Sequence, residues 1–216
     1  LALPQAILAS RQILQRFKPD VAVGVGGYAS GPVLFAAWLT GTPRVVLEQN
    51  TIPGFTNRVL GHLVDHVFIS FESSARFFPR KKTVALGNPI RRALLDNFLA
   101  SKPTSERFTI LVLGGSQGAH ALNVRLAEAA PLLAALGPTL RVVHQTGDKD
   151  RDMVAAAYAA AGVDADVRAF IEDMPPAYLG ADLVVCRAGA TTIAELGVAK
   201  RAAIFVPYPF AADNHQ

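Results

Sequence analysis

The fold is decided by one stretch in the middle of the chain, Thr109-Ile110-Leu111-Val112-Leu113-Gly114-Gly115-Ser116-Gln117-Gly118-Ala119. Its apolar run predicts a buried strand, and the glycines that follow allow a tight turn into a helix. A helix N-terminus offers unpaired N–H groups and a partial positive charge, so this turn favours an anion such as a phosphate. The pattern differs from the dinucleotide motif G-x-G-x-x-G, which argues against NAD. A structural turn without a ligand is the alternative reading of this stretch alone.

The alternation of strand and helix extends over the rest of the chain. Apolar runs predict strands at 21–25, 44–47, 66–69, 83–86, 109–113, 141–145, 167–170, 183–186 and 203–206. Segments rich in alanine and leucine predict helices at 7–17, 32–39, 119–136, 151–161 and 191–198. Continuous apolar runs are typical of parallel strands whose two faces are covered by helices. The predicted fold class is therefore α/β with parallel, Rossmann-like sheets.

A polar segment at 96–108 interrupts this rhythm and predicts a linker. It separates an N-terminal domain, 1–95, from a C-terminal domain, 109–216, and each has its own strand and glycine turn. We therefore expect two Rossmann-like domains facing a cleft, with ligands at the carboxyl ends of the strands. The chain starts at Leu1 and stops directly after a strand-like run, so we also expect it to be the middle of a longer protein.

Composition excludes several classes of protein. The chain has 216 residues, of which 51% are hydrophobic and 18% charged, so it can bury a core and is not disordered. Its apolar runs are too short to predict a membrane-spanning helix. The formal net charge of +4 suits an anionic ligand or a membrane surface but is too weak to indicate nucleic acid. The single cysteine, Cys186, rules out an internal disulfide and indicates a reducing compartment.

No metal site is predicted. The pair Asp148 and Asp150 has the outline of a metal-binding D-x-D motif, but it precedes a predicted helix, where acidic residues are common. Of the five histidines, only His62 and His66 are spaced as metal ligands on a helix could be, four residues apart, but they straddle a predicted helix–strand boundary. Cys186 lies inside a predicted strand and is interpreted as a packing residue.

A second glycine-rich turn lies in the first half, at 24–32. Its four glycines exceed what a simple turn needs, and the hydroxyls of Tyr28 and Ser30 could face a diphosphate. Asn50 follows a predicted strand end and suits the vicinal hydroxyls of a sugar, although a loop-capping role is the alternative. Arg91 could contact a base or a phosphate, or could be an ordinary surface arginine.

The third turn of this kind is Arg187-Ala188-Gly189-Ala190-Thr191-Thr192-Ile193-Ala194-Glu195. Small residues at the start of the predicted helix allow close backbone approach, and Thr191 and Thr192 are good N-terminal donors. Glu195 lies about one turn into the helix, where its carboxylate could accept both hydroxyls of a ribose. The alternative is a glutamate that stabilises the helix dipole.

Two segments could contact a membrane. The run Phe77-Phe78-Pro79-Arg80-Lys81-Lys82 mixes aromatic and cationic residues, as interfacial segments do, but it is equally typical of a solvated loop. The helix predicted at 7–17 carries Arg11 and Arg16 among its apolar residues, which fits either core packing or membrane contact.

Together these turns resemble one family. The motifs are Gly26-Gly27-Tyr28-Ala29-Ser30-Gly31-Pro32, Glu48-Gln49-Asn50, Gly87-Asn88-Pro89-Ile90-Arg91, Gly114-Gly115-Ser116-Gln117-Gly118-Ala119 and Ala190-Thr191-Thr192-Ile193-Ala194-Glu195. Their order and spacing, over essentially the whole chain, are similar to the MurG family, which transfers N-acetylglucosamine from UDP-N-acetylglucosamine to lipid I, forming lipid II in bacterial peptidoglycan synthesis. The resemblance implies the GT-B fold, transfer with inversion, and a peripheral place on the cytoplasmic side of the inner membrane.

The resemblance also implies roles for the matching residues. Ser116 would contact the UDP diphosphate, and Glu195 the ribose. Asn50 and Gln216 would hydrogen-bond N-acetylglucosamine, while Arg91 and the backbone of Ile171 would border the uracil. The other implied positions are Ala190, Thr191, Thr192, Ile193 and Ala194 around the donor sugar and nucleotide, and Gly27, Tyr28 and Ser30 in a loop for the acceptor diphosphate.

The general base is not identified. The family usually has histidine before Glu-Gln-Asn, where this chain has Leu47, and the family's first glycine loop, which ends in histidine, would precede residue 1. Glu48 is the candidate within the chain. The implied partners are the donor, lipid I, the membrane surface and other cell-wall and division proteins, with no cofactor, metal or nucleic acid. The alternatives are another UDP-sugar enzyme of GT-B fold, such as a glycolipid glycosyltransferase or UDP-N-acetylglucosamine 2-epimerase, and a non-catalytic cell-wall scaffold.

Overall fold

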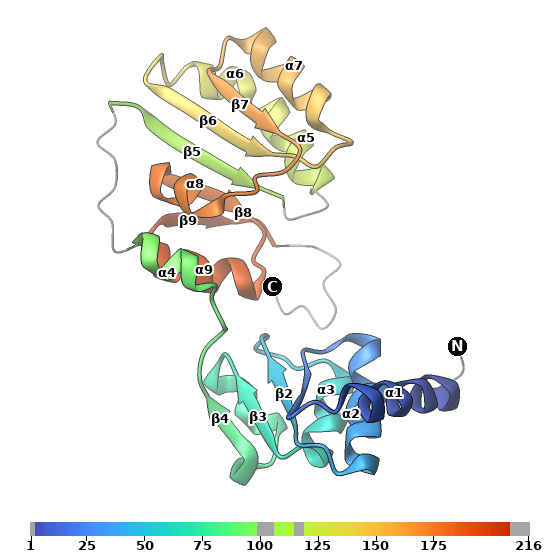
Figure 1. Ribbon diagram of the computed structural model, residues 1–216. Helices are drawn as coiled ribbons and strands as arrows, with labels where there is room; N and C mark the ends of the chain where they lie inside the picture. The colour runs from blue at the N-terminus through green and yellow to red at the C-terminus, as the bar shows by residue number, and fades with distance from the viewer. Residues whose placement is uncertain (1–2, 99–105, 115–118, 208–216) are drawn as a thin grey trace. The chain divides into compact units, whose positions relative to one another are not determined.

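The computed structural model describes residues 3–98, 106–114 and 119–207 and has two compact units, which divide between Pro89 and Ile90. Each unit contains one parallel sheet with helices packed on it (Figure 1). The predicted fold class, α/β with parallel Rossmann-like sheets, is confirmed. No helix among the described residues has the length and apolar character needed to cross a membrane.

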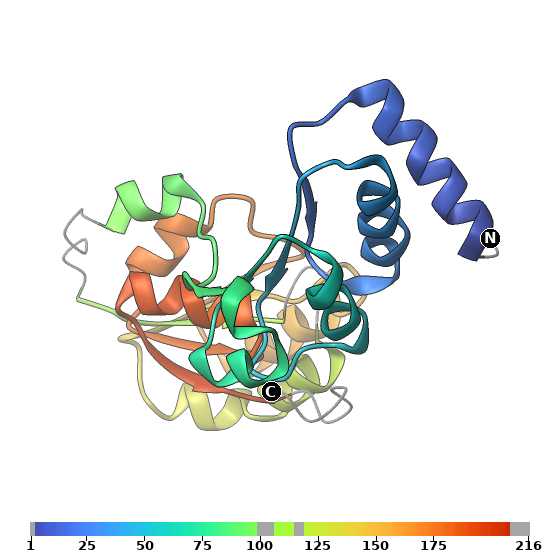
Figure 2. The same ribbon diagram turned by 90° about the horizontal axis from the view of Figure 1, so that it is seen from below.

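The first unit has a four-stranded sheet in the order β1-β2-β3-β4. The strands are β1 (Ala22–Gly24), β2 (Arg44–Glu48), β3 (His66–Ile69) and β4 (Thr83–Ala85). The helices are α1 (Leu3–Phe17), α2 (Gly27–Thr40) and α3 (Phe55–Leu63), with 3-10 turns η1 (Glu72–Phe77) and η2 (Arg80–Lys82) before β4. Leu34, Val46 and Val67 form the centre of its core, and α1 lies against α2 (Figure 2).

The glycine-rich turn of this unit is shorter than the predicted loop at 24–32. Gly26 and Gly27 have φ values of 93° and 75°, which residues with a side chain rarely adopt. A Cβ on Gly24 would lie 2.4 Å from Cδ1 of Leu34, so glycine there allows α2 to pack directly on β1. The helix already begins at Gly27 and contains Gly31 and Pro32, which in the sequence suggest a loop.

The second unit has a five-stranded sheet in the order β7-β6-β5-β8-β9. The strands are β5 (Phe108–Leu113), β6 (Leu140–Gln145), β7 (Ala165–Arg168), β8 (Leu183–Cys186) and β9 (Ala202–Phe205). The helices are α4 (Arg92–Phe98), α5 (His120–Glu128), α6 (Ala130–Ala134), α7 (Arg151–Ala161), α8 (Met174–Gly180) and α9 (Ala190–Ala199). The strand order reverses between β5 and β8, so a topological switch point lies there.

Alternate residues of β5 supply the two cores of this unit. Leu111 and Leu113 pack with α4, α8 and α9, whereas Ile110 and Val112 pack with α5, α6 and α7 on the other face. The two layers of helices are visible in Figure 1. This arrangement explains why the strands are continuous apolar runs, since both of their faces are buried.

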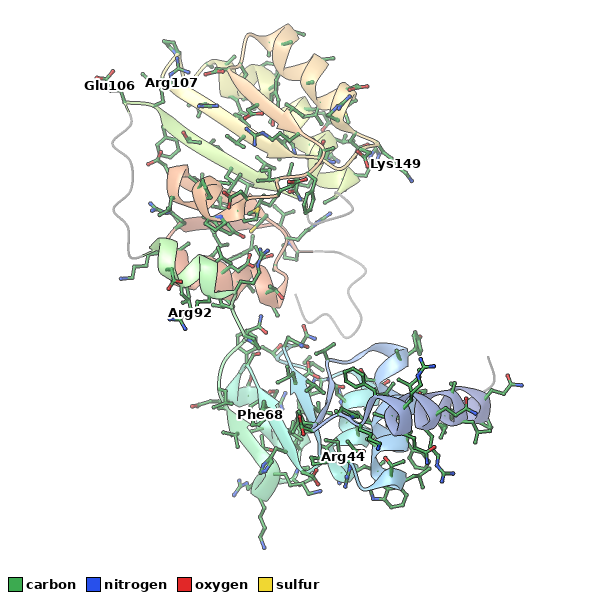
Figure 3. The ribbon with its side chains drawn as sticks, in the orientation of Figure 1. Arg44, Phe68, Arg92, Glu106, Arg107 and Lys149 are labelled. Atoms are coloured by element: carbon green, nitrogen blue, oxygen red, sulfur yellow. The ribbon has the colours of Figure 1, made fainter. Side chains whose placement is uncertain are left out.

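The division between the units precedes the predicted domain end at residue 95. Helix α4 packs on α8 and α9 of the second unit through Leu94, which is buried. Its other face is polar, with exposed Arg92 (labelled in Figure 3) paired with Asp96. Because this face is polar, the sequence from Asp96 onward resembles a linker, which is why the linker was predicted at 96–108. Where this range is described, residues 96–98 belong to α4 and Phe108 opens β5.

The nine predicted strands are confirmed, with ends that differ by at most two residues. The helix predicted at 119–136 is two helices, α5 and α6, which meet at Ala129. Helices α3, α4 and α8 were not predicted. Helix α8 begins Met174-Pro175-Pro176, and prolines are compatible with a first helical turn, although in the sequence they suggest a loop.

Candidate nucleotide-binding site

A cavity of about 470 Å³ opens at the carboxyl ends of β5, β6 and β8. Leu113 and Gln145 are the last residues of two of these strands, and Arg187 directly follows the third. In open parallel sheets, ligands bind at this edge and at the switch point. The cavity brings together five of the predicted site residues, namely Arg91, Ile171, Thr191, Thr192 and Glu195.

Glu195 is held by contacts from Tyr178 and Arg91. Its Oε2 accepts a hydrogen bond of 2.9 Å from the hydroxyl of Tyr178 on α8. Its Oε1 lies 3.8 Å from Nη2 of Arg91, just before α4. The Glu195 side chain is 13% exposed and that of Arg91 65% exposed, so the carboxylate is enclosed while the arginine is largely solvated. The carboxylate can accept further hydrogen bonds from hydroxyl groups in the cavity.

Helix α9 presents its N-terminus at the same cavity. It follows Gly189 without a hydrogen bond from a capping side chain, and Thr191 and Thr192 of its first turn line the cavity. Small residues leave the first N–H groups accessible, and the helix dipole favours a negative charge nearby. The other predicted residues of this helix are Ala190, Ile193 and Ala194, which are partly buried and are not among the described residues that line the cavity.

The backbone of Ile171 is fixed by a residue that sequence reasoning missed. The side chain of Gln145 accepts a hydrogen bond of 2.8 Å from the backbone N–H of Ile171, and both residues are buried. This N–H is therefore already engaged. Tyr178 and Arg187 were also missed as site residues. Gln145 and Arg187 could have been found from their positions at strand ends, whereas the sequence around Tyr178 contains no such signal.

Arg187 connects β8 to the segment after β9. Its Nη1 donates hydrogen bonds to the carbonyl oxygens of Val206 (3.1 Å) and Pro207 (2.9 Å). The neighbouring Cys186 is buried in β8, and burial raises the pKa of its thiol to about 11. The thiol is thus protonated at neutral pH, as expected for a packing residue rather than a nucleophile.

Asp150 of the candidate D-x-D motif is engaged in hydrogen bonds within the second unit. Asp150 lies directly before α7 and accepts hydrogen bonds from Asn123 (2.7 Å) and His120 (3.0 Å). These hydrogen bonds, that from Asn123 foremost, lower the pKa of Asp150. Within residues 3–98, 106–114 and 119–207, no three side chains of His, Cys, Asp or Glu gather as metal ligands would.

Glu48 and Asn50 lie in the first unit, at the end of β2. Glu48 is buried, and its Oε1 accepts hydrogen bonds from the backbone N–H (2.9 Å) and side-chain Nδ2 (3.2 Å) of Asn50. Its Oε2 accepts a hydrogen bond of 2.8 Å from Asn57 on α3, a residue that the sequence analysis did not select. Both oxygens of Glu48 are therefore occupied in shaping the loop, an arrangement unlike that of a base open to substrate.

Gly27, Tyr28 and Ser30, predicted in a loop, lie in the first turn of α2. The hydroxyl of Ser30 donates a hydrogen bond of 2.6 Å to the carbonyl of Gly26, so it is used within the helix. Tyr28 is 98% exposed. The predicted contacts of Ser116 and Gln216 lie outside the described residues.

Both halves of the chain match models of one family. The glycosyltransferase family 28 N-terminal domain matches residues 1–69, and the glycosyltransferase family 28 C-terminal domain matches residues 109–216. A protein of Anaeromyxobacter sp. (strain Fw109-5) is 58% identical over 100% of this chain and 57% of its own length. It is named UDP-N-acetylglucosamine--N-acetylmuramyl-(pentapeptide) pyrophosphoryl-undecaprenol N-acetylglucosamine transferase. A protein of the same name from Myxococcus xanthus (strain DK1622) is 57% identical over 100% of the chain and 56% of its own length.

Solved structures have the same fold. The crystal structure of MurG from Acinetobacter baumannii matches with a TM-score of 0.75 and 39% identity, over 100% of this chain and 62% of that one. A UDP-GlcNAc 2-epimerase from Neisseria meningitidis bound to UDP-GlcNAc matches with a TM-score of 0.67 over 94% of this chain and 63% of that one. At 15% identity, the second likeness shows the fold alone. The chain spans little more than half the length of the curated relatives, and over that span it belongs to glycosyltransferase family 28.

Proposed function

We propose that this chain is part of an enzyme that transfers N-acetylglucosamine from UDP-N-acetylglucosamine to lipid I, forming lipid II. The observation that carries the proposal is the 58% identity, over the entire chain, to a relative whose name states a transfer between these groups. The cavity at the switch point of the second unit supports it, because it combines an enclosed carboxylate, a cation and a helix N-terminus. Of the alternatives, the 2-epimerases share only the fold at 15% identity or less in the structures compared.

The second unit would bind the UDP part of the donor. Glu195 would accept hydrogen bonds from the ribose hydroxyls, and Arg91 and the Ile171 backbone would border the uracil. Because the N–H of Ile171 is engaged by Gln145, the base would have to be read by the carbonyl of Ile171. Ser116 and the N-terminus of α9 would stabilise the diphosphate, with the remaining first-turn residues around the donor sugar. Asn50 and Gln216 would hydrogen-bond the N-acetylglucosamine.

The reaction would be a direct displacement with inversion. A hydroxyl of the muramic sugar attacks the anomeric carbon as the bond to UDP breaks, so one glycosidic bond forms, UDP leaves with the bonding electrons, and the hydroxyl proton passes to a base. Negative charge develops on the diphosphate, where N–H groups and a serine hydroxyl lower the barrier. Glu48 is a poor base in this geometry, because it is 1% exposed and both of its oxygens accept hydrogen bonds.

The first unit would bind the acceptor and the cytoplasmic face of the inner membrane. Helix α1 exposes Leu8, Ile13 and Phe17, at 59%, 60% and 78%, with Arg11 and Arg16 between them. An apolar cavity of about 340 Å³ lies between α1, α2 and α3, and Leu3 and Ile7 of α1 line it. Exposed apolar side chains interspersed with cations are typical of helices that bind the surface of anionic membranes.

Donor binding and turnover test the proposal directly. In isothermal titration, the intact protein should bind UDP-N-acetylglucosamine at least about ten-fold more tightly than UDP-glucose. With a lipid I analogue, it should release one UDP for each disaccharide formed. Binding of neither sugar nucleotide would refute the proposal and favour a non-catalytic scaffold. Formation of UDP-N-acetylmannosamine without an acceptor would instead indicate a 2-epimerase.

Vesicle co-sedimentation tests the membrane contact. Ile13→Glu places a carboxylate on the exposed face of α1 and should lower binding to anionic vesicles several-fold. The matched control is Leu132→Glu, on α6 of the second unit, where the leucine is 74% exposed and the change should have no effect. Equal binding of the unmodified protein to neutral vesicles at high salt would contradict the electrostatic part of the proposal.

A further inference from the structure

Tyr178 is a core residue with one polar atom at the edge of the cavity. It is 1% exposed, and its ring lies in the same hydrophobic core as Leu113, Cys186 and Leu196. Its hydroxyl donates a hydrogen bond of 2.9 Å to Oε2 of Glu195 at the cavity. A ring that is packed on all sides cannot follow a moving partner, so the position of this oxygen is set by the core.

The direction of the hydrogen bond is determined by its chemistry. Burial, together with the negative charge of Glu195, raises the pKa of the Tyr178 hydroxyl, which therefore keeps its proton at neutral pH. A carboxylate oxygen accepts and a protonated phenol donates, so the O–H of Tyr178 points at Oε2.

The second contact of the carboxylate is weaker. Oε1 lies 3.8 Å from Nη2 of Arg91, beyond hydrogen-bond distance, and the Arg91 side chain is 65% exposed. Of the two contacts, the bond from Tyr178 is thus the one that fixes the plane of the carboxylate. A carboxylate held in one orientation can accept hydrogen bonds from two vicinal hydroxyls, whereas a free one would rotate toward the arginine.

We propose that Tyr178 is a positioning residue that holds Glu195 for recognition of a ribose, and so sets the preference of the site for ribonucleotides over 2′-deoxyribonucleotides. The inference rests on the proposed function, and it adds a specificity determinant to that function. Tyr178 acts through Glu195, since its hydroxyl is directed at the carboxylate.

The experiment compares UDP and 2′-deoxy-UDP as ligands of the intact protein by isothermal titration. Tyr178→Phe removes only the hydroxyl and keeps the ring in the core. It should weaken UDP binding about ten-fold, the loss expected for one hydrogen bond to a charged group. Binding of 2′-deoxy-UDP, which has already lost one contact to the carboxylate, should weaken by less than about three-fold. The ribose preference should therefore fall, and Glu195→Gln should lower it as well.

The matched control is Tyr158→Phe. Tyr158 is also 1% exposed, and its hydroxyl contacts His144 in the core on the other face of the sheet. This variant should keep the ribose preference even if its melting temperature falls. Equal weakening of both ligands by Tyr178→Phe would overturn the inference, because a purely structural role affects both alike. If the unmodified protein binds UDP and 2′-deoxy-UDP equally well, the inference about Tyr178 is overturned, while UDP binding by the site stands. If the unmodified protein does not bind UDP, the proposed function is overturned.

Discussion

Acid should destabilise the second unit through His144, a histidine of β6 that is fully buried. Nδ2 of Asn123 donates to the carbonyl of Thr146 (2.8 Å) and to Asp150 (2.7 Å), so its Oδ1 faces His144 as an acceptor. Nε2 of His144 therefore carries the proton and donates over 3.1 Å, and Nδ1 accepts from the hydroxyl of Tyr158 over 3.0 Å. Both nitrogens of the neutral ring therefore have a hydrogen-bond partner. A second proton, on Nδ1, would meet the Tyr158 hydroxyl, which donates to this nitrogen when the ring is neutral.

Burial lowers the pKa of His144 from 6.5 to about 4, and the charge of Asp150 offsets this effect only in part. In the unfolded chain, His144 titrates near its ordinary value. Between the two values, the unfolded state binds a proton that the folded state does not, so the free energy of unfolding falls as the pH falls. The contribution is complete above about pH 6.5 and is lost toward pH 4. Linkage then gives a loss of about 2 to 3 kcal/mol between pH 7 and pH 4.5.

The assay is urea unfolding at both pH values, followed by far-UV circular dichroism. His144→Gln keeps one donor and one acceptor but does not titrate. Between pH 7 and pH 4.5 its free energy of unfolding should therefore fall by about 2 to 3 kcal/mol less than that of the unmodified protein. Trp38 is the only tryptophan in the sequence and lies on α2, so its fluorescence reports the first unit in the same experiment. His62→Gln, at an exposed position of α3, is the control and should behave like the unmodified protein. Parallel loss of stability in the unmodified protein and in His144→Gln would refute the reasoning.

Four further substitutions test packing, loop structure and chemistry separately. Gly61→Ala would bring a Cβ within 2.6 Å of Cδ1 of Phe78 and should lower the free energy of unfolding by about 1 to 3 kcal/mol in a thermal melt. Gly197→Ala, which meets open space in α9, should instead raise it by up to about 1 kcal/mol, and a gain at both positions would contradict the clash. Glu48→Gln turns an amide N–H₂ toward hydrogen-bond donors and should lower the free energy of unfolding in urea by about 2 kcal/mol. The kcat of the folded fraction should stay within about three-fold of that of the unmodified protein. A stable variant with a hundred-fold lower kcat would identify Glu48 as the base. Ser116→Ala should lower kcat more than it raises the donor KM, and an unchanged kcat with a raised KM would refute leaving-group stabilisation by this serine.

Only some of the site residues could be predicted from the sequence, and individual residues show why. Glu195 and Thr191 could be found because they follow a strand and a glycine turn in the sequence, and this local pattern places them at a sheet edge. Tyr178 could not be found, because its role depends on a hydrogen bond between two helices that pack only in the folded unit. The same holds for Asn57, which reaches Glu48 from a helix that the sequence analysis missed.

Ser30 is a residue that the sequence placed at the site and whose hydroxyl the structure uses within a helix instead. A serine in a glycine-rich stretch suggests a hydroxyl open to a ligand, but the helix starts early enough for Ser30 to donate to the carbonyl of Gly26. Competition of this kind between a ligand and the local backbone depends on where the helix begins, and glycine and proline obscure that point in the sequence.

The amino-acid sequence by itself determined the strands, their parallel direction and the glycine turns, because these depend on short apolar runs and on backbone freedom at single residues. Only the tertiary structure decided which unit α4 joins, which oxygen of Glu195 is tied to Tyr178, and that both oxygens of Glu48 are occupied. The physical reason is that a buried polar group must find its partner wherever the chain packs, and packing joins residues whose separation along the sequence has no pattern.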